Sequence, residues 1–328
     1  MLNLILGLFI GKSIDIEYAY GCQISGTNQS GFAAAIELAR LSDVVFFFGG
    51  IDQSIEKEGT DRNTIDLPPI QIELLQQIIQ VVHSPIHVVI MSGSSLDLSF
   101  IRDSSSYGSL IWMGYAGQAG GQAIANVIFG QYNPGGRLPI TFYPASYVNQ
   151  VSMFDMQMRP SPTNPGRTYK FYTGQPVYEF GTGLSYTTFT YSWSNNTVAS
   201  SYSIDTLIQN HHHERHANVG NFRVNVTNTG LMGGDDVVLA FITPPQEFVS
   251  GETPPIKQLF GFERVHLNVN ESKEVFFPIN IDTLLLVAHD GSKWLHSGLY
   301  RIIFGQQWMH TIELHGASTR WSVVYSLE

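Results

Sequence analysis

The chain has 328 residues and a single cysteine, Cys22, so it cannot build an internal disulfide framework or a zinc site of several thiolates. Basic residues are also scarce, with 17 Lys and Arg against 27 Asp and Glu and a formal net charge of −10. Because no dense basic stripe offsets this charge, the chain is a poor candidate for binding nucleic acid. A neutral partner such as a sugar fits better.

Long apolar runs are absent as well. The apolar start, residues 1–10, is too short to span a bilayer, and it lacks the basic region and cleavage site of a signal peptide. We expect it to form a buried strand or helix separated from its upstream neighbours, and we expect no membrane association.

The composition is globular, with 43% hydrophobic and 13% charged residues, and the length favours two domains. In the first part, apolar runs alternate with amphipathic segments. This alternation predicts right-handed βαβ units and a mostly parallel α/β sheet flanked by helices. The expected helices are 30–41 with Ser30 as N-cap, 70–82 opened by Pro68 and Pro69, and 117–129 closed by Gly130, and the expected strands are 43–50, 86–91 and 109–114.

The connections that follow these strands are the places to look for chemistry. Ligands of parallel sheets bind beyond the carboxyl ends of the strands. The loops after Phe48, Met91 and Trp112 are therefore candidates for the functional site.

The rest of the chain has a different character. Residues 133–192 are rich in Pro, Gly and aromatics, which predicts a structured connector. Short alternating runs at 222–230, 237–242, 273–279, 298–304 and 311–315 then predict an antiparallel immunoglobulin-like sandwich. We place the α/β domain at 1–145, the connector at 146–195 and the all-β domain at 196–328.

An acidic loop follows the first expected strand directly. The segment 50–62 contains Glu56, Glu58, Asp61 and Arg62 at the ligand-facing end of the sheet. Neighbouring charges can tune the pKa of a carboxylic acid in such a loop, which is how general acids are adjusted. A solvated, charged loop without a function is the alternative that composition favours.

Four stretches resemble family 3 glycoside hydrolases of the β-xylosidase and β-glucosidase type. They are Gly-Ile-Asp-Gln-Ser-Ile-Glu-Lys-Glu-Gly-Thr-Asp-Arg at 50–62, Ile111 to Pro139, and the pair 165–172 and 178–186. The resemblance begins around Ile14. It implies an α/β sandwich, incomplete at its N-terminus, followed by a fibronectin type III-like domain. An amino-terminal barrel would precede both and is missing from this chain.

The resemblance also implies a chemistry. A retaining, exo-acting enzyme of this kind hydrolyses β-linked xylo- or gluco-oligosaccharides without a cofactor or metal, using two carboxyl groups about 5 to 5.5 Å apart. The barrel would supply the aspartate nucleophile. The motif Glu-Gly-x-Asp-Arg points to Glu58 as acid/base, with Glu56 close behind, and Asp61 and Arg62 would hold the loop. We expect the chain alone to be inactive, and a non-catalytic carbohydrate-binding or scaffold protein is the alternative.

The family further implies an extracellular, lysosomal or vacuolar location. If the chain is exported, sequons at Asn28, Asn195, Asn225 and Asn270 are candidates for glycosylation.

Three other patterns have simpler explanations than the functions they suggest. Gly114, Gly117 and Gly120 lack the spacing and the downstream acidic residue of a dinucleotide site, and indicate a tight turn. The His-rich segment 211–216 indicates an exposed polar insertion rather than a metal site. Trp112, Tyr115 and Tyr132 could stack on a sugar, although aromatics near strand ends are more often core.

Overall fold

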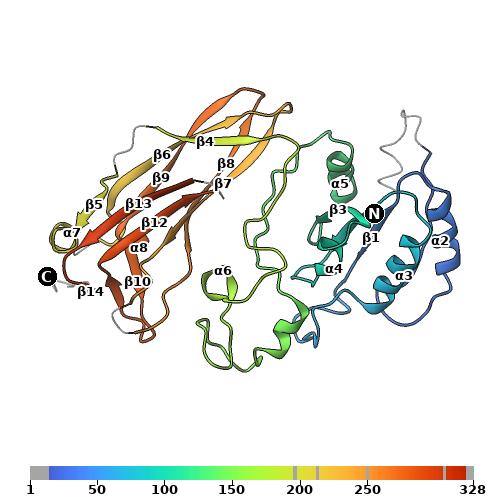
Figure 1. Ribbon diagram of the computed structural model, residues 1–328, viewed down its shortest axis with the longest axis horizontal. Helices are drawn as coiled ribbons and strands as arrows, with labels where there is room; N and C mark the ends of the chain where they lie inside the picture. Colours follow the sequence, from blue (N-terminus) through green and yellow to red (C-terminus); the bar gives the residue numbers. More distant parts are fainter. Residues whose placement is uncertain (1–14, 195–197, 212–213, 249–250, 306–307, 323–328) are drawn as a thin grey trace. The chain divides into compact units, whose positions relative to one another are not determined.

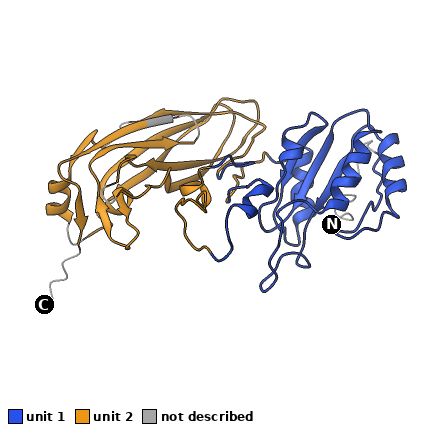
Figure 2. Ribbon diagram, turned by 60° about the horizontal axis from the view of Figure 1, so that its bottom comes forward, with its two compact units in different colours: residues 1–132, 140–154, 174–180 blue, residues 133–139, 155–173, 181–328 orange. Residues whose placement is uncertain are grey.

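The structure is a computed structural model that describes residues 15–194, 198–211, 214–248, 251–305 and 308–322. The apolar run 1–10 lies outside these residues. The chain divides into two compact units (Figure 2). Unit 1 comprises residues 1–132, 140–154 and 174–180, and unit 2 comprises 133–139, 155–173 and 181–328. Each unit is made of three separate pieces of the chain, whereas the predicted boundaries at residues 145 and 195 divide the sequence into consecutive parts.

Unit 1 contains a parallel sheet with helices around it (Figure 1). The strands β1, β2 and β3 lie in that order and pair in parallel, as predicted. The helices α2 and α3 pack against each other. The elements are α2 (Phe32–Leu41), β1 (Phe46–Gly50), α3 (Pro69–Ile79), β2 (Ile86–Met91), α4 (Ser99–Arg102), β3 (Tyr107–Trp112), α5 (Gly120–Ile128) and the 3₁₀ helix η1 (Ala145–Asn149).

Two predicted helix starts are wrong. Ser30 is not the N-cap of α2, because its backbone N–H donates to Asn28 Oδ1 in a preceding turn and Gly31 takes the cap position. The helix α5 begins at Gly120 rather than at residue 117, since the Gly120 N–H closes a turn onto the Gly117 carbonyl. Pro69 at the first turn of α3 and a left-handed Gly130 after α5 agree with the prediction.

The carboxyl end of β1 is fixed by a glycine and a buried glutamine. Gly50 has a φ of 133°, and a Cβ there would overlap the backbone of Met91 on β2. Gln71 of α3 is 3% exposed. Its Oε1 accepts from the Gly50 N–H at 2.8 Å, and its Nε2 donates to the Gly50 carbonyl at 2.7 Å. These contacts set the direction in which the acidic loop leaves the sheet.

Unit 2 consists mainly of β-sheet, as predicted. One sheet has the order β4-β6-β9, a second β5-β13-β12-β7-β8, and a third β10-β11-β14. Within the second sheet only the β13–β5 pair is parallel. The elements are α6 (Thr168–Phe171), β4 (Phe189–Trp193), β5 (Ser201–Ser203), α7 (Ile204–His211), β6 (Asn218–Asn228), β7 (Gly234–Thr243), β8 (Gln258–Leu267), β9 (Ser272–Asn280), α8 (Ile281–Leu284), β10 (Leu285–Val287), β11 (Lys293–Leu295), β12 (Gly298–Phe304), β13 (Trp308–His315) and β14 (Thr319–Trp321).

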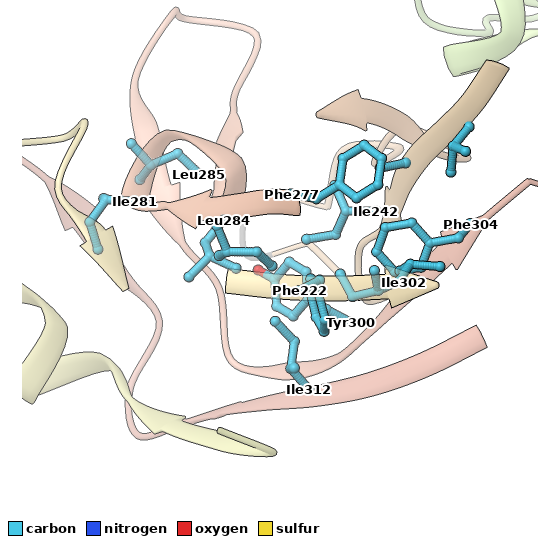
Figure 3. Packing of buried hydrophobic residues seen from close by; sticks show 14 of the residues in the cluster. Phe222, Ile242, Phe277, Ile281, Leu284, Leu285, Tyr300, Ile302, Phe304 and Ile312 are labelled. Carbon is cyan, nitrogen blue, oxygen red and sulfur yellow. The ribbon is translucent and has the colours of Figure 1, made fainter. Parts of the chain in front are cut away.

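Alternating side chains of these strands form the core of unit 2 (Figure 3). Phe222 of β6 and Phe277 of β9 come from one sheet, while Ile242 of β7 and Phe304 of β12 come from another, and all four are at most 2% exposed. Such interleaving of inward-facing residues is the packing expected of a sandwich.

A buried ion pair ties an early segment of the chain into this unit. Asp236 on β7 is fully buried and accepts a hydrogen bond of 2.7 Å from Arg137 Nη2. The Tyr191 hydroxyl donates to its other oxygen. Burial, followed by the charge of Asp236, raises the pKa of Tyr191 far above its ordinary value, so the tyrosine stays protonated as a donor.

No helix in the described part of the chain is both long and apolar enough to cross a membrane.

The position of Gly50 yields a stability prediction. Gly50→Ala should destabilise unit 1 by about 3 kcal/mol or more, because a left-handed backbone strain of roughly 1–3 kcal/mol adds to the overlap with Met91. Hydrogen exchange of the β1 and β2 amides measures the loss. Gly117→Ala is the control, since its Cβ would meet no atom within 4 Å. Equal exchange in both variants would contradict this explanation.

Candidate functional site

The acidic loop begins with a single helical turn. The N–H groups of Ile55 and Glu56 both donate to the Asp52 carbonyl at 3.0 Å. The Asp52 carboxylate accepts from the N–H and hydroxyl of Ser54, which fixes the start of the turn. Because this turn follows Gly50 and Ile51 directly, Glu56 comes back over the carboxyl ends of the strands.

Glu56 is held by donors from two other loops. Its Oε1 accepts from the Gly93 N–H at 2.7 Å and from the Tyr115 hydroxyl at 2.6 Å. Its Oε2 accepts from the Ser94 hydroxyl. Gly93 and Ser94 follow β2, and Tyr115 follows β3, so the three loops singled out in the sequence meet at this carboxylate.

Arg62 completes the arrangement. Its Nε lies 3.7 Å from Glu56 Oε2, and its Nη2 donates to Ser94 Oγ at 2.8 Å and to the Ser95 carbonyl at 3.0 Å. The two side chains are only 13% and 15% exposed. Nη1 of Arg62 is buried and has no acceptor within the residues that the structure describes.

Glu58 and Asp61 lie differently. Lys57 and Thr60 bridge a tight turn with Glu58 and Gly59 at its tip, and Gly59 has the positive φ of 76° that a type II turn requires at its third position. Glu58 and Asp61 are both exposed. The structure thus brings Glu56 and Arg62 together and leaves Glu58 and Asp61 at the surface.

These contacts determine the charge of Glu56. Burial raises its pKa, but the hydrogen bonds from Ser94, Tyr115 and the Gly93 N–H, with the charge of Arg62, outweigh burial and lower the pKa below the ordinary value of 4.5. Burial and the bond to Glu56 raise the pKa of Tyr115 to about 12. At neutral pH the site therefore holds a carboxylate anion and a neutral phenol.

The other aromatic candidates have different surroundings. Trp112 donates from Nε1 to Ser92 Oγ and packs edge-on against Phe142, so part of its ring belongs to the interior. Tyr132 is 44% exposed. Tyr115 is 47% exposed and makes the contact to Glu56 that its position in the sequence did not reveal.

The four sequons differ in their surroundings. Asn28 and Asn270 are exposed, Asn225 is part of β6, and Asn195 lies outside the described residues. Glycosylation of these residues stays a prediction.

The His-rich segment 211–216 is described except for residues 212 and 213. In this segment Arg215 and His216 contact Asp282. No group of three or more potential metal ligands occurs in the described part of the chain.

Comparison with known protein families gives two matches. The model for the glycosyl hydrolase family 3 C-terminal domain matches residues 9–186, and that for a fibronectin type III-like domain matches residues 236–307. A probable exo-1,4-beta-xylosidase of Aspergillus clavatus is 38% identical over 309 residues, which are 92% of this chain and 38% of the relative. The probable beta-D-xylosidase 6 of Arabidopsis thaliana is 40% identical over 301 residues, 84% of this chain and 37% of its own length.

Solved structures agree with these matches. A family 3 exo-beta-xylosidase in complex with a xylobiose aziridine probe has a TM-score of 0.88 and 34% identity, over 97% of this chain and 42% of that one. A family 3 beta-glucosidase of Bifidobacterium adolescentis has a TM-score of 0.75 and 25% identity, over 94% of this chain and 45% of that one. The chain spans less than half the length of these proteins. It belongs to glycosyl hydrolase family 3, with the family's C-terminal domain followed by a fibronectin type III-like domain.

Proposed function

We propose that this chain supplies the general acid/base of a retaining, exo-acting β-glycosidase of the β-xylosidase type, and that Glu56 is the acid/base. The nucleophile would come from an amino-terminal barrel, and the substrates would be β-linked xylo- or gluco-oligosaccharides. The relatives named above carry xylosidase and glucosidase names, which supports this substrate class.

The convergence of three loops on one carboxylate carries the proposal. An acid/base must be held in place while it passes a proton to and from the glycosidic oxygen. Glu56 has four fixed contacts, whereas Glu58 lies exposed at the tip of a turn. This difference favours Glu56 over Glu58, which the sequence motif had placed first.

The charge of Glu56 explains why a second part is needed. In glycosyl-enzyme formation the acid must be protonated, yet the pKa of Glu56 is lowered in this chain. A nucleophile carboxylate placed about 5 to 5.5 Å away would raise the pKa of Glu56 by like-charge repulsion until the glycosyl-enzyme forms. The anionic form then suits the second step, in which the residue takes a proton from water. Because the nucleophile would come from the barrel, we expect no turnover by the chain alone.

In the first step the glycosidic bond breaks, the proton of Glu56 goes to the leaving oxygen, and the nucleophile forms its bond to the sugar. In the second step water attacks the sugar, the bond to the nucleophile breaks, and the proton of the water returns to Glu56. This chemistry requires no cofactor. The extracellular, lysosomal or vacuolar location that the family implies stays a prediction.

Substitution of the two glutamates distinguishes their roles. With the chain joined to the barrel part of the Aspergillus clavatus xylosidase, Glu56→Gln should reduce hydrolysis of xylobiose by about 10²–10⁴-fold, the usual contribution of acid/base catalysis. Aryl β-xylosides with activated leaving groups should be affected less in the glycosylation step, because they need little protonation.

Glu58→Gln is the matched control and should retain nearly full activity on both substrates. The opposite pattern would assign the role to Glu58. Equal activity in the wild type and both variants would favour a non-catalytic, carbohydrate-binding or scaffold function.

The hydrogen bond from Tyr115 yields a prediction about pH. Tyr115→Phe removes a donor that favours the charged form of Glu56, so the pKa of Glu56 should rise toward 4.5. A carboxyl ¹³C titration by NMR, with the signal assigned through Glu56→Gln, measures the change. Tyr18→Phe, another half-exposed tyrosine of unit 1, is the control.

The same bond should affect stability over a defined pH range. Because the folded-state pKa of Glu56 lies below its ordinary value, its stabilisation is complete above pH 4.5 and is lost as the pH falls through the folded-state pKa. Tyr115→Phe should therefore cost about 1 kcal/mol at neutral pH and progressively less in acid. A loss that does not depend on pH would mean that packing, not the bond to Glu56, explains the effect.

A further inference from the structure

Ser92, which directly follows β2, is a buried polar residue beside the candidate site. It is 0% exposed. Its Oγ accepts a hydrogen bond of 2.9 Å from Trp112 Nε1 and donates one of 2.7 Å to the Ser94 carbonyl. An indole N–H can only donate and a carbonyl can only accept, so the hydroxyl proton of Ser92 must point at Ser94. The direction of this short chain of hydrogen bonds is therefore fixed.

Ser94 takes part in a second chain whose direction is also fixed. Its hydroxyl accepts from Arg62 Nη2 at 2.8 Å and donates to Glu56 Oε2. A guanidinium can only donate and a carboxylate can only accept, so the hydroxyl proton of Ser94 belongs to the bond with Glu56. Ser92 thus holds the carbonyl of the residue whose hydroxyl holds the candidate acid/base.

The turn at residues 92–94 contacts the carboxylate with its backbone as well. The Gly93 N–H donates to Glu56 Oε1 at 2.7 Å. A Cβ at Gly93 would lie 2.8 Å from Tyr115 Cε2 and 3.1 Å from Glu56 Oε1, so the side chains of Tyr115 and Glu56 both pack directly on the backbone of the turn. Any shift of this backbone would change the lengths of two hydrogen bonds to Glu56 at once.

The other end of the first chain is anchored inside unit 1. Trp112 is the last residue of β3 and pairs with Ile90 of β2 in the register of the sheet. Its ring packs edge-on against Phe142, with the ring centroids 5.8 Å apart, and Phe142 is 1% exposed. The indole N–H is therefore held in place by the sheet and by the interior, and it fixes the position of the Ser92 hydroxyl.

We propose that Ser92 is a positioning residue for Glu56. Its hydroxyl, held by the Trp112 indole, fixes the turn from which Gly93 and Ser94 donate to the carboxylate. A catalytic carboxyl group needs such support, because a misplacement of about 1 Å can cost about 10²-fold in rate. The inference rests on the proposed function for the role of Glu56 and adds the residue that aligns it.

The pKa of Glu56 in the full chain tests this role without requiring activity. Ser92→Ala releases the turn, so the hydrogen bonds that lower the pKa of Glu56 should lengthen and the pKa should rise. The rise should be smaller than in Ser94→Ala, which removes a donor outright. A carboxyl ¹³C titration by NMR measures both. Ser106→Ala, a half-buried serine just before the opposite end of β3, is the matched control and should leave the pKa unchanged.

The charged and titratable groups near Glu56 stay the same in these variants. Arg62, on the same loop, lowers the pKa of Glu56, and Tyr115 faces Glu56 from the loop after β3. The charge of Asp52 acts on Tyr115. Because no substitution at Ser92 alters these groups, a changed titration reports on the hydrogen bonds.

Trp112→Phe tests the same chain from its other end, and it supplies the measurement if Ser92→Ala does not fold. It keeps an aromatic ring beside Phe142 and removes the N–H that holds Ser92, so the pKa of Glu56 should rise by less than in Ser92→Ala. In the double variant the pKa should equal that of Ser92→Ala, because both substitutions break one chain of hydrogen bonds. Additive rises would mean that Trp112 acts by another route and would contradict the inference.

Activity gives a second measurement. With the chain joined to the barrel part of the Aspergillus clavatus xylosidase, Ser92→Ala should lower kcat for xylobiose about tenfold and change KM by less than about twofold. Aryl β-xylosides with activated leaving groups should lose less, because they need little protonation. Equal losses on both substrates would indicate a general structural defect and would count against a positioning role.

The two proposals fail in different ways. An unchanged pKa of Glu56 in both Ser92→Ala and Trp112→Phe would overturn the inference and leave the proposed function intact. If Glu56→Gln kept its activity while Ser92→Ala raised the pKa of Glu56 in the wild-type background, the proposed function would be wrong and Ser92 would still position the carboxylate.

Discussion

The hydrogen bonds to the Glu56 carboxylate are the interaction on which the arrangement of the three loops of unit 1 depends. A partly buried charge is tolerated only when hydrogen-bond donors surround it. Here the donors come from the loops after β2 and β3, while the carboxylate itself comes from the loop after β1. Only strands that run in parallel bring three such loops to one edge of a sheet.

The geometry of this edge depends in turn on residues with no chemistry of their own. Gly50 allows β1 to approach Met91 more closely than any side chain would permit. Gln71 satisfies both backbone groups of Gly50 from inside the fold. These two residues set the direction of the first turn of the loop, so a substitution at either should move Glu56 without contacting it.

Much of this could be predicted from the sequence, and the limits have physical causes. Uninterrupted apolar runs identified the parallel strands, and the rule for the carboxyl ends of such strands identified the three loops. The strand β8 was missed, because five of its residues, including Glu263 and Arg264, carry polar or exposed side chains that hide the alternation.

The choice between Glu56 and Glu58 also lay beyond the sequence. Both residues satisfy the acidic pattern, and the difference arises from a turn at Gly59 and from contacts to Ser94 and Tyr115, which are 38 and 59 residues away from Glu56. No local pattern contains such distant pairs. Serine and tyrosine directly after buried strands were the available signal, and their meaning becomes clear only once the strands are placed side by side.

The buried pair of Arg137 and Asp236 has a consequence for how the protein can be divided. Arg137 belongs to the first short piece of unit 2, residues 133–139, and the chain passes through unit 1 at residues 140–154 before it returns to unit 2 at Asp155. Excision of the fibronectin type III-like part at a point after Pro139 would leave Asp236 as a buried charge without its counterion, at a cost of about 3–5 kcal/mol. If the fibronectin type III-like part is produced alone, it therefore has to keep the short Asn-Pro-Gly-Gly-Arg segment at 133–137. This segment comes before the strands of the sandwich in the sequence.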